Sequence, residues 1–357
     1  MKAQQVVMVT GASAGLGRSI AHEFAKQGAC IGLIARNREA LEACSEEVQQ
    51  LGGEALVLPL DVSDAASVEH AATRLEEAFG PIDVWVNNAM TSVFSPVKKM
   101  IPEEYKRVTE VSYLGYVYGT LSALRRMLPR DRGTIIQVGS ALAVRSIPLQ
   151  SAYCGAKHAI IGFTDSLRCE LYHDKSNVQL TVVQMPAMNT TQFTWVKSRL
   201  PDKPQPVPPI FQPEVAARVV VYAAGVDRPR REYWVGSPTV QAIVGQMFVP
   251  SLLDRYLGDT GYEAQQTDVL DDPDRLDNLW DYVPGRHGAH GPFNKEAHFF
   301  SPQVFMDLHH NWFVAAGTAF VTAAVVGWKK FQQSRKETSN VIAAESRQSA
   351  GKIGRTA

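Results

Sequence analysis

VVMVTGASAGLG, residues 6–17, is the stretch that decides the fold. It begins with an apolar run without polar alternation, which is typical of a parallel strand covered on both faces. A glycine-rich turn follows, and Ile20 and Phe24 then begin a helical pattern. A dinucleotide site requires this order, because glycines permit close backbone approach and the helix N-terminus offers free N–H groups to a pyrophosphate.

A second apolar run covers residues 30–35 and ends at Arg36. An acidic residue at this turn would bind the ribose hydroxyl of NAD, whereas an arginine accommodates the 2′-phosphate of NADP. The turn carries no carboxylate, so the sequence favours NADP(H) as the cofactor. The alternative is that Arg36 is only a solvated loop residue.

Further apolar runs alternate with helical patterns as far as residue 236. Strands are predicted at 55–60, 82–89, 134–138, 178–184 and 231–236, and long helices at 103–128 and 152–172. This repeated alternation is typical of an α/β fold with a doubly wound parallel sheet, the Rossmann fold. We assign residues 1–238 to a nucleotide-binding domain of this class.

The size and composition of the chain exclude some classes of function. The chain has 357 residues, more than one core usually needs, and its 36 basic and 36 acidic side chains give no basic field that would point to nucleic acid. Its four cysteines form no CxxC pair, which predicts reduced thiols and no zinc site. Residues 1–5 lack the apolar core of a signal peptide, so we expect the N-terminal part in the cytoplasm.

Tyr153 and Lys157 are the candidate catalytic pair. They lie four positions apart, so on a helix they share one face and an ammonium stands beside a phenol. A nearby cation favours the ionised phenol and lowers its pKa from about 10 toward the working range. Ser140 follows the strand predicted at 134–138 and could bring its hydroxyl beside the phenol. Such a pair also recurs by chance in many proteins.

Together these residues resemble the short-chain dehydrogenase/reductase family from about residue 6 to residue 236. Residues 10–17 fit its cofactor motif, Asp61-Val62 its adenine-contacting step, Asn87-Asn88-Ala89 its sheet-stabilising segment, and Ser140, Tyr153 and Lys157 its catalytic trio. The resemblance implies a cofactor site formed by Gly11, Ser13, Ala14, Gly15, Leu16, Gly17, Arg36, Asp61, Val62, Asn88, Ala89, Tyr153, Lys157, Pro186 and Thr191.

The mechanism that the resemblance implies is hydride transfer at C4 of the nicotinamide, coupled to proton transfer at a carbonyl or hydroxyl of a small-molecule substrate. Tyr153 would be the general acid in reduction and the base in oxidation. Ser140 would bond the substrate oxygen. Lys157 would lower the pKa of Tyr153 and hold the nicotinamide ribose.

Three positions depart from the family pattern. Met90 replaces a glycine, Ala187 replaces a glycine after Pro186, and Ser112 replaces an asparagine that serves a proton relay. If that asparagine acts through its backbone carbonyl, Ser112 can substitute for it as a catalytic residue. If its side chain is needed, turnover suffers.

Residues 185–213 include six prolines between 201 and 213, which forbid a regular helix over most of this region. Ligands of α/β sheets bind beyond the carboxyl ends of the strands, so this loop either covers the substrate or is a rigid surface loop that contacts a partner.

Residues 239–300 form a C-terminal extension. Apolar residues at helical spacing between 240 and 257 predict an amphipathic helix pair, which would serve as core packing, a lid or a membrane-surface contact. An irregular acidic, glycine- and histidine-bearing segment follows. His287 and His290 lack a third ligand, so we predict no metal.

Residues 312–328 are expected to form a transmembrane or membrane-embedded helix. The stretch carries no charge between Trp312 and Trp328, but at about 1.5 Å per residue it spans roughly 25 Å, slightly less than a bilayer core of about 30 Å. A buried soluble helix is the alternative. The basic tail, 329–357, is expected to be disordered and to prefer the cytoplasmic side of the membrane. The catalytic domain is expected on that side as well. A single membrane span cannot leave both the tail and the catalytic domain on the same side.

The sequence therefore predicts a membrane-associated, NADP(H)-dependent oxidoreductase that faces the cytoplasm and acts on an alcohol/carbonyl pair of a lipophilic substrate. A cofactor-binding regulatory or scaffold protein, inactivated through Ser112 and Met90, is the second hypothesis. The family resemblance also implies a homodimer or homotetramer, formed through the helices at 103–128 and 152–172.

Overall fold

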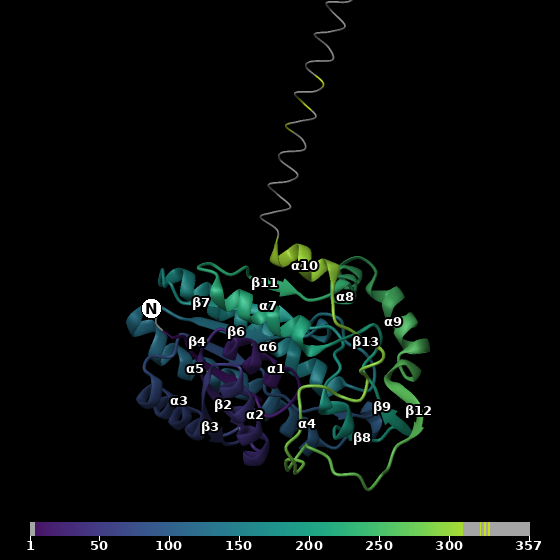
Figure 1. Ribbon diagram of the computed structural model, residues 1–357. Helices are drawn as coiled ribbons and strands as arrows, with labels where there is room; N and C mark the ends of the chain where they lie inside the picture. Colours follow the sequence, from purple (N-terminus) through teal and green to yellow (C-terminus); the bar gives the residue numbers. More distant parts are fainter. Residues whose placement is uncertain (1–3, 310–321, 323–324, 326–327, 329–357) are drawn as a thin grey trace, which may run out of the picture. The chain divides into compact units, whose positions relative to one another are not determined.

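The computed structural model describes residues 4–309 and the single positions 322, 325 and 328. Its centre is a seven-stranded parallel sheet in the order β11-β7-β6-β4-β1-β2-β3 (Figure 1). The strands are β1 (Val6–Thr10), β2 (Cys30–Ala35), β3 (Glu54–Pro59), β4 (Val84–Asn87), β6 (Thr134–Val138), β7 (Gln179–Gln184) and β11 (Glu232–Trp234). The predicted Rossmann-like α/β fold is confirmed.

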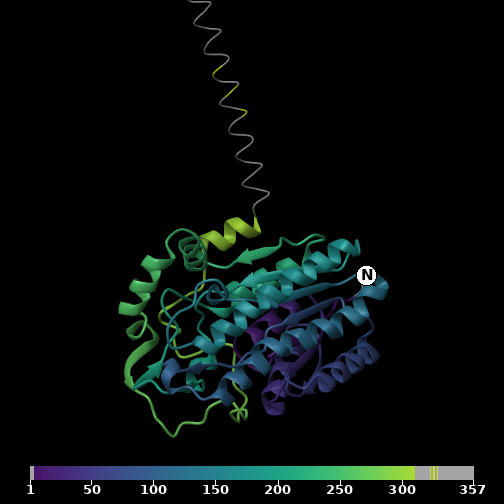
Figure 2. The same ribbon diagram turned by 180° about the vertical axis from the view of Figure 1, so that it is seen from behind.

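Helices cover both faces of the sheet, which is why its strands are apolar without alternation (Figure 2). On one face α1 (Gly15–Ala25) packs against α2 (Arg38–Gln50) and α7 (Pro213–Gly225). The other face carries α3 (Ala65–Phe79), α5 (Gly115–Met127) and α6 (Ser151–His173), whose apolar side chains share one buried cluster with Trp85 and Ile135 of the sheet.

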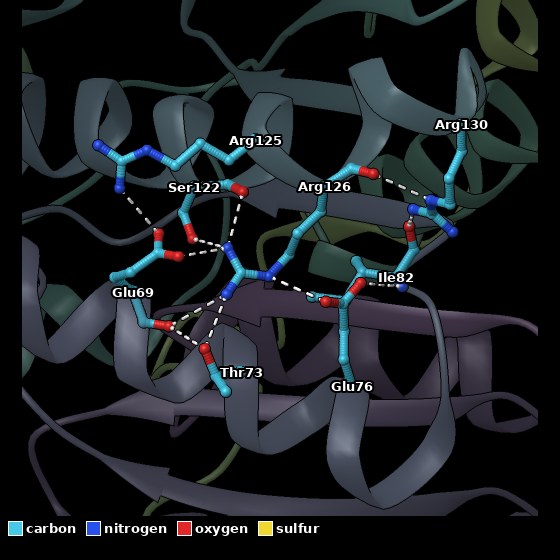
Figure 3. Close-up of polar contacts among 8 residues, drawn as sticks. All are labelled: Glu69, Thr73, Glu76, Ile82, Ser122, Arg125, Arg126 and Arg130. Atoms are coloured by element: carbon cyan, nitrogen blue, oxygen red, sulfur yellow. Dashed lines mark hydrogen bonds and ion pairs between the residues drawn. The ribbon is translucent and has the colours of Figure 1, made fainter.

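A polar clamp joins α3 to α5 (Figure 3). The Arg126 guanidinium donates to Glu69 at 2.7 Å and to Thr73 at 2.9 Å, and it pairs with Glu76 at 3.1 Å. A planar guanidinium suits this role because its donors form a fixed fork. The clamp joins two helices of the layer that also contains α6.

The helix predicted at 103–128 is interrupted. It consists of α4 (Pro102–Thr109), a π-helical turn η2 (Glu110–Leu114) and α5. Ser112 lies in the middle of the π turn, a feature that often marks functional sites.

The proline-rich loop at 185–213 forms short strands that pair with distant segments. β8 (Lys197–Ser198) pairs with β5 (Val93–Phe94), β9 (Asp202–Pro204) with β12 (Gln266–Leu270), and β10 (Ile210–Phe211) with β13 (Ala297–His298). The extension therefore folds together with residues 1–238, in one compact unit that ends at Val304.

The extension begins with the helix pair α8 (Ser237–Phe248) and α9 (Pro250–Thr260). An irregular segment lies between β12 and β13, and α10 (Pro302–Leu308) is the last element within residues 4–309. Within the parts of the chain that the structure describes, no helix is long and apolar enough to cross a membrane. The membrane helix expected at 312–328 lies outside the described residues, apart from Thr322, Val325 and Trp328, and so does the tail 329–357.

Candidate active site

A single cavity of about 600 Å³ lies beyond the carboxyl ends of the strands. It is lined by the glycine turn, by the loop after β7 and by residues of α8 and α9. The predicted site residues that line it are Gly11, Ser13, Ala14, Gly15, Leu16, Gly17, Arg36, Asp61, Val62, Asn88, Ala89, Ser140, Tyr153, Lys157, Pro186 and Thr191. Folding thus brings together every predicted site residue except Ser112.

The glycine turn leaves no room for side chains. Gly11 and Gly15 have φ angles of +69° and +56°, where glycine is favoured. A Cβ on Gly17 would lie 2.1 Å from the Gly11 carbonyl oxygen. Asn88 fixes the turn from the side, because its Nδ2 donates to the Thr10 carbonyl at 2.9 Å. Because these glycines carry no side chains, a ligand or another segment of the chain can approach the backbone at the start of α1 closely.

A buried network ties β4 to its neighbours. Asn87 Nδ2 donates to Thr120 at 3.1 Å and to Gln137 at 3.0 Å, and Asn87 Oδ1 accepts from Trp85 Nε1 at 2.9 Å. Every polar atom of this amide is used, as burial demands. The network fixes the strand end that carries Asn88 and Ala89 into the cavity.

The three catalytic candidates come from two elements. Ser140 follows β6, and its N–H donates to Gln184 Oε1 at 2.8 Å, while Tyr153 and Lys157 lie on the first turns of α6. The Lys157 ammonium lies 5.6 Å from the centre of the Tyr153 ring, and Ser140 and Tyr153 are hydrogen-bonded. A hydroxyl, a phenol and an ammonium thus meet in one cavity with the glycine turn.

The family model of the short chain dehydrogenases matches residues 5–200. The chain belongs to the short-chain dehydrogenase/reductase family. It is an oxidoreductase of this family. Its three catalytic candidates line one cavity with the glycine turn.

Three similar proteins match this chain over at least three quarters of their own length. An uncharacterized oxidoreductase, YxnA, of Bacillus subtilis is 32% identical over 79% of this chain and 80% of its own. A fatty acyl-CoA reductase of Acinetobacter baylyi is 31% identical over 64% of this chain and 75% of its own. A metagenomic short-chain oxidoreductase solved in complex with NADP is 29% identical, with a TM-score of 0.55 over 65% of this chain and 96% of its own.

Partial burial at the cavity surface raises the pKa of Tyr153 above its ordinary value, and the hydrogen bond with Ser140 offsets only part of this rise. Burial also lowers the pKa of Lys157 to about 7, because its side chain is 1% exposed. The expected lowering of the Tyr153 pKa by Lys157 is therefore not found. Physically, a desolvated lysine with this pKa is only partly charged near neutrality, so its field on the phenol is weak.

Lys157 has a partner that the sequence did not reveal. Its Nζ donates to Tyr116 Oη at 2.8 Å and to the Val138 carbonyl at 2.8 Å. Tyr116 is 1% exposed and donates in turn to Val138 at 3.0 Å. Its place in the sequence, four residues after Ser112, gives no chemical signal, because only tertiary contact brings the hydroxyl to the ammonium.

Ser112 lies behind the cavity and is fully buried. Its Oγ donates to the Thr91 carbonyl at 2.8 Å and accepts from the Thr91 N–H at 2.9 Å. The hydroxyl is thus committed to holding the π turn against the loop after β4. The other two departures, Met90 and Ala187, line the cavity.

Arg36 is part-buried and is engaged by the extension rather than by solvent alone. Its Nη1 donates to the Trp280 carbonyl at 2.7 Å and its Nη2 to the Asn278 carbonyl at 2.6 Å. Asp61 is also engaged, since it pairs with Arg107 and accepts from Ser63 Oγ at 2.8 Å. Nothing in the sequence indicates that Arg107 and residues 278–280 contact these two side chains.

The two histidines of the extension have other partners. His290 Nε2 lies 2.7 Å from Glu214, and His287 Nε2 lies 2.8 Å from the Val283 carbonyl. No cluster of three or more His, Cys, Asp or Glu side chains that could hold a metal ion occurs among the described residues.

Proposed function

We propose that this protein is an NADP(H)-dependent oxidoreductase that interconverts an alcohol and a carbonyl in a lipophilic substrate at a membrane. One observation carries the proposal. The glycine turn, Arg36 and the hydrogen-bonded Ser140–Tyr153 pair line one continuous cavity, so a nucleotide and a substrate can meet there. Its volume of about 600 Å³ lies in the usual range of ligand sites.

The chain's own residues supply the proton chemistry. A phenol whose pKa is raised stays protonated near neutrality, so Tyr153 can donate its proton to a carbonyl oxygen during reduction. The Ser140 hydroxyl binds that oxygen and places it beside the phenol. Lys157, held by Tyr116 and Val138, contributes positive charge next to the phenol when it is protonated. The bound cofactor supplies or accepts the hydride.

A direct assay tests the enzymatic part. NADPH absorbance is followed with a panel of aldehydes and ketones, and alcohol oxidation is followed with NADP⁺. We expect turnover that disappears in Tyr153→Phe. Nucleotide binding without Tyr153-dependent turnover of any substrate would instead favour the regulatory or scaffold function, which the departures at Ser112 and Met90 would then explain.

NADP(H) is proposed over NAD(H) because of Arg36. The turn after β2 carries this arginine and no carboxylate, and the related metagenomic oxidoreductase was solved with NADP. Charge-assisted bonds to a phosphate are worth about 1.5–3 kcal/mol each, so Arg36→Ala should weaken NADPH binding by about 10- to 100-fold more than it weakens NADH binding.

Arg38→Ala is the matched control, since this neighbouring arginine is exposed and pairs with Glu42 at 3.7 Å. Equal losses of NADPH and NADH affinity in Arg36→Ala would contradict the phosphate contact.

The lipophilic substrate is inferred from the end of the cavity away from the glycine turn. Apolar residues of the proline-rich loop and of the helix pair gather there, among them Pro206, Val207, Pro208, Ala242 and Leu257. A relative named fatty acyl-CoA reductase points to the same class. Within a series of straight-chain aldehydes, kcat/KM should rise with chain length, because each buried CH₂ contributes about 0.8 kcal/mol. A flat series would count against this substrate class.

Membrane association is supported by an exposed apolar face on α8 and α9. Met247 is 63%, Phe248 79% and Leu252 64% exposed, and Tyr256 on the same helix pair lines the cavity. These exposures disfavour core packing for this face. Arg145 anchors the pair by donating to Asp254 at 2.6 Å and to Gln246 at 2.8 Å. The uncharged stretch 312–328 would add a second attachment.

Flotation with liposomes separates the two attachments. The full chain should float, a chain truncated before Trp312 should float less, and the truncated chain with Met247→Ser, Phe248→Ser and Leu252→Ser should stay at the bottom. Equal flotation of all three chains would refute both attachments. In cells, we propose that the catalytic domain faces the cytoplasm, which protease protection of sealed vesicles would test.

We propose assembly as a homodimer or homotetramer through α5 and α6. Leu121 on α5 is 44% exposed and Tyr172 on α6 is 74% exposed, which leaves apolar surface on both helices. Light scattering after size-exclusion chromatography should give two or four chains for the wild type and a smaller particle for Leu121→Glu. A monomeric wild type would exclude this assembly.

A further inference from the structure

Residues 278–291, here called the strap, cross the nucleotide half of the cavity. They belong to the irregular segment between β12 and β13, which Figure 1 draws in yellow-green. Asn278, Tyr282, Val283 and His287 of the strap line the same cavity as the glycine turn. The segment lies beyond residue 236, where the family resemblance ends.

The first half of the strap is bound to the adenosine end of the site through its carbonyl groups. Arg36 donates to the carbonyls of residues 278 and 280, as described above. Asn37 Nδ2 donates to the Val283 carbonyl at 3.0 Å and to the Gly285 carbonyl at 2.9 Å. Arg107 Nε donates to the Leu279 carbonyl at 2.9 Å. Three side chains of the nucleotide-binding fold thus hold five carbonyls of the extension.

The second half is bound to the glycine turn and to the loop after β7. The Gly15 N–H, at the first residue of α1, donates to the Gly288 carbonyl at 3.0 Å. Arg18 Nη1 donates to the Arg286 carbonyl at 2.7 Å. The rings of His287 and Trp195 lie 4.5 Å apart. The strap is therefore anchored on both sides of the nucleotide half.

The strap forms a wall of the cavity and does not fill it. With the strap in place, the cavity still reaches the glycine turn, Arg36, Asp61 and Val62. A guanidinium has five N–H donors, and the strap carbonyls occupy two of those of Arg36. The remaining donors are held in a fixed orientation by these two bonds, which suits recognition of a phosphate.

One strap side chain has an unused acceptor. Asn278 Oδ1 is buried and accepts no hydrogen bond from any residue that the structure describes. A buried amide oxygen without a donor is costly, and this one belongs to a residue in the cavity wall. The Asp61 carboxylate, the other acceptor near this end, is already shared by Arg107 and Ser63. The 6-amino group of adenine is a donor of the kind that Asn278 lacks.

We propose that the strap is the outer wall of the nucleotide site, and this rests on the NADP(H) dependence proposed above. The strap carbonyls orient the Arg36 guanidinium so that it can bind the 2′-phosphate. Asn278 Oδ1 accepts a hydrogen bond from the adenine amino group. The strap opens when the nucleotide enters or leaves. The strap is thus a specificity element for the cofactor that lies outside the family's motifs.

Loosening the strap tests its role in release. Asn37→Ser keeps the cap of α2, where Asn37 Oδ1 accepts from Ala40 N at 3.1 Å, but removes the two bonds to the strap. Two hydrogen bonds of about 1 kcal/mol each predict that NADPH dissociates about 10- to 30-fold faster, measured by stopped-flow chase of nucleotide fluorescence. Calorimetry should show weaker NADPH binding.

Asp64→Ser is the matched control. Asp64 caps α3 through Ala66 N at 3.0 Å and, among the described residues, its side chain bonds only to Ala66 and Ser67. Its NADPH dissociation rate should equal that of the wild type. Tighter NADPH binding by Asn37→Ser would show that the strap competes with the nucleotide, and an unchanged dissociation rate would show that it does not cover the site. Either result overturns the proposal.

A nucleotide analogue tests the adenine contact. Nicotinamide hypoxanthine dinucleotide phosphate lacks the 6-amino group, so the wild type should bind it about 5- to 10-fold more weakly than NADPH. Asn278→Leu should bind both nucleotides equally, and Asn278→Asp should keep the preference. Equal preference in wild type and Asn278→Leu would refute the contact. Failure of the wild type to bind either nucleotide would refute the proposed function and the strap's role together.

Discussion

Side chains hold the catalytic end of the cavity, whereas backbone carbonyls close its nucleotide end. At the catalytic end the Tyr116 hydroxyl accepts from Lys157, and Ser140 bonds Tyr153. At the nucleotide end, carbonyls of the strap accept from Arg36, Asn37 and Arg18. Side-chain chemistry depends on which residue type stands at each position. A backbone carbonyl, in contrast, can come from any residue type, provided that the backbone has the right geometry. One end should therefore be sensitive to single substitutions and the other to the few donors that grip the strap.

The largest effect should come from the catalytic end. Tyr153→Phe removes the proton that the substrate oxygen needs, so kcat should fall by about 10²- to 10⁴-fold. NADPH affinity, measured by calorimetry, should stay within about threefold. A comparable loss of nucleotide affinity would break the comparison, because it would place the phenol in both halves of the site.

Tyr116→Phe should have the next largest effect. The substitution leaves the buried Lys157 ammonium with one fewer acceptor, which costs about 1–3 kcal/mol and lowers kcat/KM by about 10- to 100-fold. Loss of a bond to the charged form lowers the pKa of Lys157 further, so the alkaline limb of the pH–rate profile should move to lower pH.

Tyr113→Phe, in the π turn that precedes α5, is the control for Tyr116→Phe. Its ring packs on Phe163 with centroids 6.5 Å apart, and it should leave the pH profile unchanged. An identical profile in Tyr116→Phe would show that Tyr116 only fills space.

The pH dependence of stability should report on Lys157 directly. Burial lowers its pKa to about 7, whereas the unfolded chain binds the proton up to about pH 10.5. Between these values the unfolded state carries more protons, so the free energy of unfolding should rise with pH. Relative to Lys157→Met, the wild type should gain at most about 1.4 kcal/mol per pH unit between pH 7 and 9, measured by urea denaturation. Parallel curves would contradict the lowered pKa.

The smallest effect should come from Asp281, an exposed carboxylate of the strap. Burial lowers the pKa of Arg36, and the charges of Asp61 and Asp281 act in the opposite direction, so Asp281 lies within electrostatic reach of the guanidinium. Asp281→Asn should strengthen NADPH binding by about two- to threefold at low salt and leave NADH binding unchanged. An equal gain in NADH affinity would contradict the proposed contact between Arg36 and the 2′-phosphate.

The sequence was sufficient to predict those features of the fold and of the cavity that depend on residue type. The apolar runs at 6–10, 30–35 and 134–138 coincide with β1, β2 and β6, and the residues of the glycine turn line the cavity as predicted. Tyr116 was missed because its role arises from a contact between α5 and α6. The strap was missed because its contribution is backbone carbonyls, which leave no trace in residue identity.

Pattern reasoning also failed where long-range pairing overrides local preference. The prolines in 185–213 correctly predicted the absence of a regular helix, but they did not predict that β9 and β10 pair with strands about 60 to 90 residues away in the extension. The helix predicted at 103–128 has the correct extent, but a π turn interrupts it. Within this turn, Ser112 forms two hydrogen bonds with the backbone of Thr91.

The pairing of β9 with β12 has a consequence for how such enzymes diverge. One uninterrupted stretch of chain supplies α8 and α9 beside the apolar end of the cavity, then β12, and then the strap at the nucleotide end. A recombination event that exchanged this stretch for that of a relative would replace residues beside the substrate and residues beside the nucleotide at the same time. Substrate range and nucleotide preference would be inherited as a single trait.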